Sequence, residues 1–200
     1  MPRTARTLTS QTTYHILAHG NNHQTVFHEP PDYETYRRLL LDLLAETPTL
    51  RCYHYCLMPN HVHLLLYAEQ AQAMVTTLQR LQLSYAWYYR RIYRVSGHLW
   101  QGRYKSLPVL DDPYLLEAGR YIERNPLEAK LAEKPESYLW SSYRHTALGQ
   151  PNPLISLSPA YLGLAPTPQA RQIAWQQYVA QNRLYPNPST QQLAGTFQGW

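Results

Sequence analysis

The stretch MPNHVHLLL, residues 58–66, places two histidines within a run that is otherwise mostly apolar. Side chains of a β-strand alternate between its two faces, so His61 and His63 share one face while the apolar residues beside them face the other way. We therefore predict a strand over residues 61–68 that aims two imidazoles at one point and packs its other face against a core.

The segments around this strand predict a mixed arrangement of helices and strands. Pro59-Asn60 predicts a tight turn, which would join the histidine strand to an antiparallel partner. Asp32 is a candidate N-cap for the first helix, and Pro108 restricts the last strand to a sheet edge. The predicted elements, in chain order, are strand 12–20, helix 33–46, strand 50–57, strand 61–68, helix 71–93, strand 104–110, and a helix from 111 toward 124 that ends near Asn125-Pro126.

Without its last helix, this order is the βαββαβ pattern of a ferredoxin-like sheet. We expect an α+β fold with two helices on one sheet face, an open opposite face for a ligand, and one added helix. The composition changes near residue 150, where a proline-rich region surrounds one predicted helix, 167–183. The predicted divisions are an N-terminal arm at 1–11, a main domain at 12–148, and a C-terminal helical extension with a tail at 149–200.

The composition bounds the class of protein. The chain has 200 residues, 44% of them hydrophobic, which is enough for one domain with a real core. It contains no apolar run of about 18 residues, and its N-terminus MPRTARTLTS lacks a signal-peptide pattern, so we expect neither membrane insertion nor secretion. Two cysteines are too few for a disulfide framework, which favours the cytoplasm.

The charge distribution favours a polyanionic partner. The formal net charge is +5, the pI is about 9.2, and no acidic residue occurs between Glu69 and Asp111. That interval interleaves cations with aromatic rings, a combination suited to phosphates and to the faces of unpaired bases. An amphipathic helix that buries its aromatic residues and exposes its arginines would give the same pattern.

Two neutral imidazoles can bind a divalent cation and leave positions open for a phosphate oxygen. Tyr121 and Asn125 are four residues apart in the last predicted helix and therefore share a face. If that face meets the histidine strand, Asn125 can supply a third ligand oxygen, and the Tyr121 phenol can attack a polarised phosphodiester. The same spacing fits an ordinary helical tyrosine and an asparagine that caps the helix. His15 and His19 share a face of the first strand, and we expect them to be structural or to contact phosphate.

Neighbouring residues offer alternatives to this site. Cys52, His54 and Cys56 would alternate onto one strand face, which makes a zinc site a rival, although thiols in a strand are usually small core residues. Glu123 would be unfavourable beside a phosphate, but helical spacing turns it away from the tyrosine. We expect Trp140 to be a packing residue below the last helix.

Five longer stretches occur in order along the chain: YHILAHGNN, LMPNHVHLLL, SGHLWQGRYKS, RYIERNP and PESYLWSSYRH. In this order and at these separations the chain resembles REP-associated tyrosine transposases, relatives of the single-tyrosine transposases with an HUH motif. The HUH motif is two histidines flanking one hydrophobic residue, here His61-Val62-His63, and the resemblance covers about residues 12–148. It implies a ferredoxin-like catalytic domain that cuts and rejoins single-stranded DNA with Mg²⁺ or Mn²⁺. It also implies that Tyr121 is the catalytic tyrosine and that Asn125 is the polar ligand from the helix.

The resemblance further implies the partners. The DNA would be a short hairpin with a neighbouring single strand, and the covalent phosphotyrosine would make a nucleotide cofactor unnecessary, since a DNA 3′-hydroxyl rejoins the strand. Relatives exist as monomers and as dimers that share the catalytic helix, so a homodimer stays an alternative. The residues then expected to contact nucleic acid are Arg90, Arg91, Arg94, Arg103, Lys105 and Tyr104.

Three other functions compete with DNA transposition. A domesticated protein could recognise the hairpin without cleaving it. An RNA-binding sheet would carry aromatic residues in short strand motifs, which are not evident here. A replication initiator or relaxase shares the histidine chemistry but is usually larger. We prefer the enzyme because His61, His63, Tyr121 and Asn125 are all present.

Overall fold

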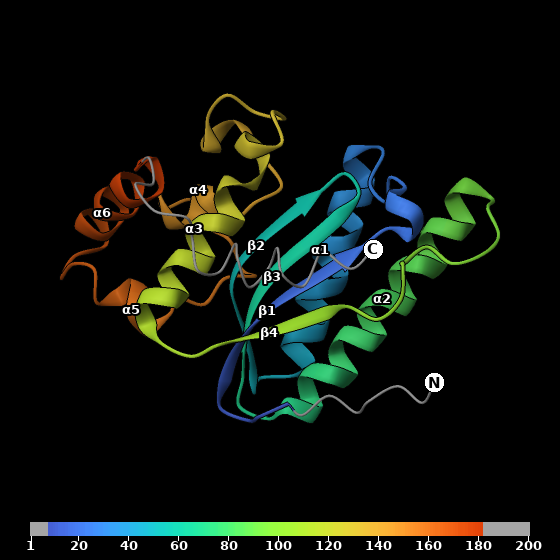
Figure 1. Ribbon diagram of the computed structural model, residues 1–200, viewed down its shortest axis with the longest axis horizontal. Helices are drawn as coiled ribbons and strands as arrows, with labels where there is room; N and C mark the ends of the chain where they lie inside the picture. The colour runs from blue at the N-terminus through green and yellow to red at the C-terminus, as the bar shows by residue number, and fades with distance from the viewer. Residues whose placement is uncertain (1–7, 182–200) are drawn as a thin grey trace.

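The computed structural model describes residues 8–181, in which a four-stranded antiparallel sheet carries helices on both faces (Figure 1). The strands are β1 (Thr12–His19), β2 (Leu50–Met58), β3 (His61–Ala68) and β4 (Lys105–Val109), in the spatial order β2-β3-β1-β4. The helices are α1 (Pro30–Glu46), α2 (Ala71–Tyr93), α3 (Asp112–Glu128), α4 (Tyr143–Thr146), α5 (Pro159–Leu162) and α6 (Pro168–Ala180), with 3-10 turns η1 (Asn21–His23) and η2 (Pro135–Ser137). The predicted ferredoxin-like α+β fold is confirmed. The predicted tail beyond residue 181 and most of the predicted arm lie outside the described residues.

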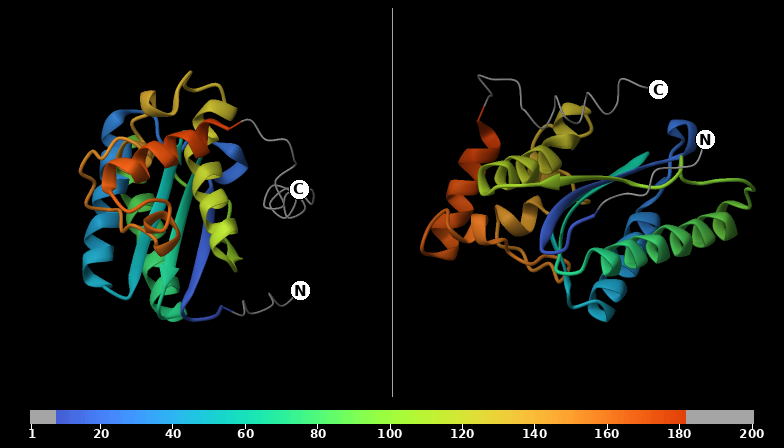
Figure 2. Two further views of the ribbon diagram at one scale, coloured as in Figure 1. Left: turned by 90° about the vertical axis from the view of Figure 1, so that its left-hand side faces the viewer. Right: turned by 60° about the horizontal axis from the view of Figure 1, so that its bottom comes forward.

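Helices α1 and α2 pack on one face of the sheet and α3 crosses the other, as the right-hand view of Figure 2 shows. A hydrophobic core forms on each face of the sheet, and the side chains of β3 point alternately into one and the other. Leu64 lies in the core under α1 and α2, whereas Leu65 packs with Ile122 of α3. The sheet face that we expected to be open is therefore covered by α3 over β2 and β3. His63 lies on this covered face, because it is two residues from Leu65.

Most predicted elements begin and end within a few residues of the observed ones, and α2 and β3 match their predicted ranges. The start of α1 differs. The helix begins at Pro30 with Glu29 as its N-cap, and Asp32 closes a capping box in the first turn. The prediction that Asp32 is the N-cap was therefore wrong, because the prolines before it can occupy the first helical positions.

No helix among residues 8–181 has both the length and the apolar character needed to cross a membrane.

Helix α3 continues through Pro126 and ends at Glu128, so the predicted end near Asn125-Pro126 was wrong. A proline inside a helix costs about 3 kcal/mol or more, since it removes one hydrogen bond and crowds the preceding turn. Here Pro126 is buried, and the Ala129 N–H donates to the Asn125 carbonyl beyond it. Burial of this last turn offsets the local cost, and Asn125 is consequently a residue within the helix and not its cap.

The segment after α3 covers the outer edge of β2. The Leu57 N–H donates to the Trp140 carbonyl at 2.9 Å, and the Ser142 N–H donates to the Tyr55 carbonyl at 3.0 Å. These bonds satisfy strand groups that would otherwise form an exposed edge. The Trp140 ring stacks on Tyr33 of α1, with centroids 4.5 Å apart, so its packing role is confirmed, with α1 as a partner.

The C-terminal extension packs against the outer side of α3. Its longest helix is α6, which begins after the N-cap Thr167 and ends at Ala180, close to the predicted range 167–183. Trp175 of α6 is fully buried in a third core that also contains Tyr143 and Tyr161. The described part of the extension is therefore a packed layer on the helix that carries Tyr121.

Gly119 brings α3 close to β2. A Cβ atom at this position would lie 2.7 Å from Nε2 of His54, and that ring is held by a hydrogen bond to Glu123. We predict that Gly119→Ala lowers the free energy of unfolding by about 1–3 kcal/mol, because the helix and strand must move apart. Urea unfolding measures the change. Gly163→Ala is the control, since its Cβ would lie 3.5 Å from its nearest neighbours; equal, small effects in both variants would contradict the close approach.

Candidate functional site

The two histidines of β3 lie together on the face that α3 covers. Their ring centroids are 4.9 Å apart, and the rings are nearly perpendicular, at 83°. His61 is partly exposed, whereas His63 is only 2% exposed. The predicted convergence of the two imidazoles is thus present in the fold.

Helix α3 adds the two residues expected from its sequence. The Tyr121 ring lies 5.6 Å from the His63 ring and 5.9 Å from the His15 ring. The Asn125 side chain lies close enough to His61, His63 and Tyr121 to affect the pKa of each, and its Nδ2 donates to the Tyr121 carbonyl at 3.0 Å. The structure therefore brings together all four residues predicted for the reaction centre, within one chain.

Neighbouring side chains fix the tautomer of His61 and allow the matching tautomer at His63. Nδ1 of His61 lies 2.7 Å from Oδ1 of Asn60, and an amide oxygen can only accept, so this Nδ1 carries the proton. Nδ1 of His63 lies 2.9 Å from Nε2 of His15. If Nδ1 of His63 carries the proton and donates to Nε2 of His15, then Nε2 of His63 keeps a lone pair, as Nε2 of His61 does. This tautomer would present two Nε2 lone pairs beside the Asn125 amide.

Burial keeps these imidazoles neutral near pH 7. Desolvation lowers the pKa of His15 to about 4 and that of His61 to about 3, and it lowers the pKa of His63 well below 6.5. Burial raises the pKa of Tyr121 above 10, although the hydrogen bond with Asn125 acts in the opposite direction. The phenol is therefore protonated at neutral pH and must lose that proton as it attacks.

The chemistry of this donor set fits a divalent cation. Neutral imidazole is the form that binds metals, and an amide oxygen suits Mg²⁺ or Mn²⁺. The contacts of Asn60 and His15 are of the kind that orient metal-binding histidines from behind. Among residues 8–181 no group of three His, Cys, Asp or Glu side chains could hold a metal ion. The candidate set is accordingly His61 and His63 with Asn125, whose amide is outside those four residue types.

The rival zinc site does not form, because Cys52, His54 and Cys56 do not share a face. Strand β2 has a bulge between Cys52 and His54, which reverses the alternation at that point. Cys52 packs in the core under α1 and α2, whereas Cys56 packs in the core under α3. His54 donates from Nδ1 to Glu123 at 2.8 Å. The strand cysteines are buried core residues with free thiols.

A cavity of about 230 Å³ lies beside His19, a neighbour of the histidine pair. His19 lines this cavity and also stacks on His61, with ring centroids 4.9 Å apart. Two of the cations predicted to contact nucleic acid, Arg103 and Lys105, line it too. The wall is completed by Leu17, His23, Gln101 and Gly102.

The other residues predicted to contact nucleic acid are exposed arginines and one buried tyrosine. The candidates Arg90, Arg91 and Arg94 are exposed at the end of α2. Tyr104 is only 5% exposed and belongs to the core, so it does not present a ring for stacking on a base, contrary to our expectation. Trp87 is the large aromatic exposed in this interval, at 61%, and a guanidinium lies 5.5 Å from its ring. Most aromatic residues of this interval are therefore packing residues, as the alternative of an amphipathic helix predicted.

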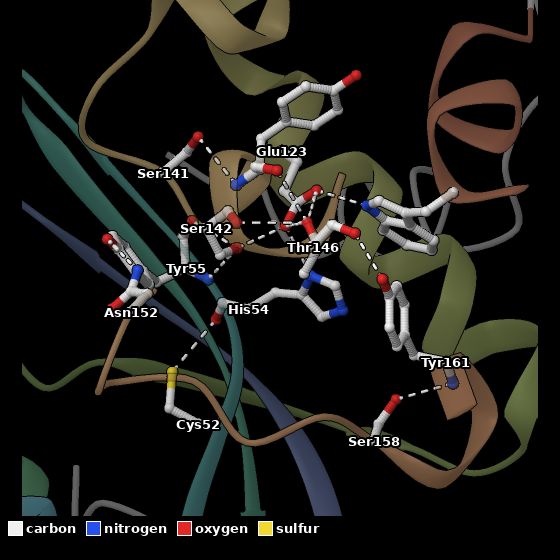
Figure 3. Close-up of polar contacts among 12 residues, drawn as sticks. Cys52, His54, Tyr55, Glu123, Ser141, Ser142, Thr146, Asn152, Ser158 and Tyr161 are labelled. Carbon is white, nitrogen blue, oxygen red and sulfur yellow. Dashed lines mark hydrogen bonds and ion pairs between the residues drawn. The ribbon is translucent and has the colours of Figure 1, made fainter. Parts of the chain in front are cut away.

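Two polar residues near the site have contacts that the sequence did not predict. His15 pairs with His63, and strand alternation could have placed it on the same sheet face once β1 was known to neighbour β3. Glu123 is fully buried and points toward His54, Ser142 and Thr146 (Figure 3). Its spacing of four and three residues from the buried Gly119 and Pro126 could have indicated an inward-facing carboxylate.

The buried state of His15 has a measurable consequence for pH stability. Its pKa is about 4 in the folded protein, and the unfolded chain binds the proton near pH 6.5. Stability from neutral His15 is therefore complete above about pH 6.5 and is lost as the pH falls toward 4. We predict that the wild-type protein loses about 2 kcal/mol more stability than His15→Gln between pH 7 and pH 5, measured by urea unfolding. Glutamine stays neutral and can still hydrogen-bond to His63; equal losses would contradict a neutral buried His15.

Comparisons with known proteins show the family and the fold. The chain matches the family model of IS200-like transposases over residues 8–125, whereas no curated protein sequence matches it significantly. A solved structure of a REP-associated tyrosine transposase bound to a REP hairpin superposes with a TM-score of 0.62 and 12% identity, covering 79% of this chain and 93% of that one. A candidate transposase of Deinococcus radiodurans R1 gives a TM-score of 0.40 and 19% identity over 68% of this chain and 98% of its own. Because the family model spans more than half of the 200 residues and the fold is that of a REP-associated tyrosine transposase, the chain belongs to the family of IS200-like transposases.

Proposed function

We propose that this transposase cleaves and rejoins single-stranded DNA at or near hairpins through a covalent phosphotyrosine at Tyr121. The observation that carries the proposal is the position of the Tyr121 ring beside the rings of His63 and His15, with Asn125 one turn further along α3. A tyrosine packed only for stability would not need two neutral imidazoles and an amide beside it. The grouping is therefore better explained by chemistry than by packing.

In the proposed reaction the Tyr121 oxygen bonds to phosphorus, and the bond between phosphorus and the 3′ oxygen breaks. Tyr121 loses its proton, and the departing 3′ oxygen gains one. A DNA 3′-hydroxyl later attacks the phosphotyrosine, which reseals a strand and restores the phenol. A Mg²⁺ or Mn²⁺ ion held by His61, His63 and Asn125 would supply positive charge at the phosphate. No nucleotide cofactor is needed, since the phosphotyrosine conserves the broken bond.

The cations near the site support a DNA partner. The similar solved structure is bound to a REP hairpin, and we propose a hairpin with its adjoining single strand as the substrate of this chain. Arg103 and Lys105 line the cavity next to His61, which suits the strand that is cut. Exposed Arg90, Arg91 and Arg94 then suit the phosphates of the hairpin.

The proposed reaction can take place within one chain, because Tyr121 meets histidines of the same chain. A homodimer stays a prediction on which the reaction does not depend. We place the protein in the cytoplasm, where its two buried free thiols suit a reducing compartment.

Removing the Tyr121 hydroxyl tests the proposed nucleophile. We predict that wild-type protein, incubated with Mn²⁺ and a labelled hairpin oligonucleotide with single-stranded flanks, forms a covalent adduct that survives a denaturing gel. Tyr121→Phe should form none while binding the same oligonucleotide with unchanged affinity. Tyr67→Phe, a change of a partly buried tyrosine on β3, should behave as wild type. Tight binding by the wild type without any adduct, on hairpins taken from the DNA around the gene, would instead support a non-cleaving binder.

Charge reversal tests the proposed hairpin contacts. Each lost phosphate contact lowers the slope of log affinity against log salt by about 0.7–0.9. We predict that Arg90→Glu with Arg91→Glu weakens hairpin binding and lowers this slope by about 1–2, measured by fluorescence anisotropy at several salt concentrations. Arg51→Glu with Arg80→Glu makes the same change in net charge at residues that pair with Glu69 and Glu46. The assignment is wrong if both double variants lose the same affinity.

A further inference from the structure

A buried carboxylate fixes the side of α3 that faces away from the histidines. Glu123 accepts hydrogen bonds from His54 Nδ1 at 2.8 Å, Ser142 Oγ at 2.6 Å and Trp175 Nε1 at 2.8 Å. Thr146 Oγ1 lies 2.9 and 3.0 Å from its two oxygens. We call Glu123 and these four donors the Glu123 network, and Figure 3 shows His54, Ser142 and Thr146 around the carboxylate. All five are nearly or fully buried.

The network joins three parts of the chain to α3. His54 comes from β2, Ser142 and Thr146 come from the segment of α4, and Trp175 comes from α6. Two further residues of α3 bind the end of α6. Arg120 donates to the Tyr178 carbonyl at 3.0 Å and to the Gln181 carbonyl, and Arg124 donates to the Val179 carbonyl at 2.7 Å. The extension is thus bound to the same two turns of α3 that carry the catalytic side chains.

The network resembles a Ser-His-acid set in composition but not in geometry. In a hydrolytic triad the serine hydroxyl bonds to the histidine, and the acid orients that histidine from its other nitrogen. In this protein Ser142 bonds to Glu123 itself, and Nε2 of His54 lies against Gly119. No hydroxyl of the network is free to meet a substrate, because all its members are buried. Nucleophilic catalysis by this set is therefore excluded, and a positioning role is left.

We propose that Glu123 is a positioning residue through which the C-terminal extension holds Tyr121 and Asn125 against the histidines of β3. The proposal rests on the proposed function of Tyr121 as the nucleophile. Glu123 lies two residues from both side chains, on the opposite side of α3. A buried carboxylate that loses a donor is left with an unsatisfied oxygen, which α3 can satisfy only by moving toward other donors or water. A shift of about 1 Å at the reacting atoms can cost a factor of about 100 in rate.

Trp175→Phe tests the network with a small change. It removes the indole N–H that donates to Glu123 and keeps an aromatic ring in the core. We expect the rate of adduct formation at saturating DNA and Mn²⁺ to fall about 10- to 100-fold, with DNA affinity unchanged. Hydrogen exchange should become faster at the amides of residues 117–128 but not at those of residues 61–68.

Two other variants separate positioning from loss of stability. Tyr178→Phe changes an aromatic residue of the same helix whose hydroxyl bonds to Glu117 and not to the network, so it should leave the rate unchanged and confine any faster exchange to the turn of Glu117. Thr146→Val removes a second donor to Glu123 and should repeat the effect of Trp175→Phe if that variant does not fold.

The outcomes are distinct. The proposal is overturned if Trp175→Phe and Thr146→Val keep the wild-type rate and α3 exchange, or if Tyr178→Phe impairs both as much as they do. If the wild-type protein forms no adduct, the proposed function fails, and hydrogen exchange still decides whether the Glu123 network holds α3. Faster exchange confined to 117–128 supports that role, and unchanged exchange rejects it.

Discussion

The candidate site depends on one packing contact, the passage of α3 across β2 and β3. Tyr121 reaches His63 only because α3 lies close to the sheet, and Gly119 permits that closeness by presenting no side chain to His54. The same His54 ring donates to Glu123. The contacts of His54 with Gly119 and Glu123 thus set both the position and the orientation of α3. One side of the helix meets the histidines, and the other meets the extension.

Desolvation gives the site its chemical character. The protein is basic overall, with a formal net charge of +5, yet its histidine cluster is neutral because burial disfavours imidazolium. Neutral rings can accept a cation without first releasing a proton. The same burial raises the pKa of Tyr121, so the phenol gains reactivity only when charge is brought to it. In the proposed reaction the phenol would therefore react only when cation and phosphate are both bound.

The sequence predicted the features that depend on local pattern. Strand alternation placed His61 and His63 on one face, helical spacing paired Tyr121 with Asn125, and the order of elements predicted the sheet. Features that depend on distant contacts were not predictable in this way. The bulge that separates Cys52 from His54 leaves no local signal, and the continuation of α3 through Pro126 follows from burial that overrides the local preference. The donors to Glu123 come from residues 19 to 69 positions away, so the role of that carboxylate was not visible in its own segment.

The most direct measurement is to find which tyrosine carries the DNA. The chain has 18 tyrosines, and trypsin would release Tyr121 in the short peptide YIER, residues 121–124, because arginines occupy positions 120 and 124. The adduct formed with a hairpin oligonucleotide would be digested with nuclease and trypsin and examined by mass spectrometry. We expect a nucleotide mass on this peptide and on no other tyrosine peptide. A nucleotide on a different tyrosine would contradict both the assignment of Tyr121 as the nucleophile and the positioning role of α3.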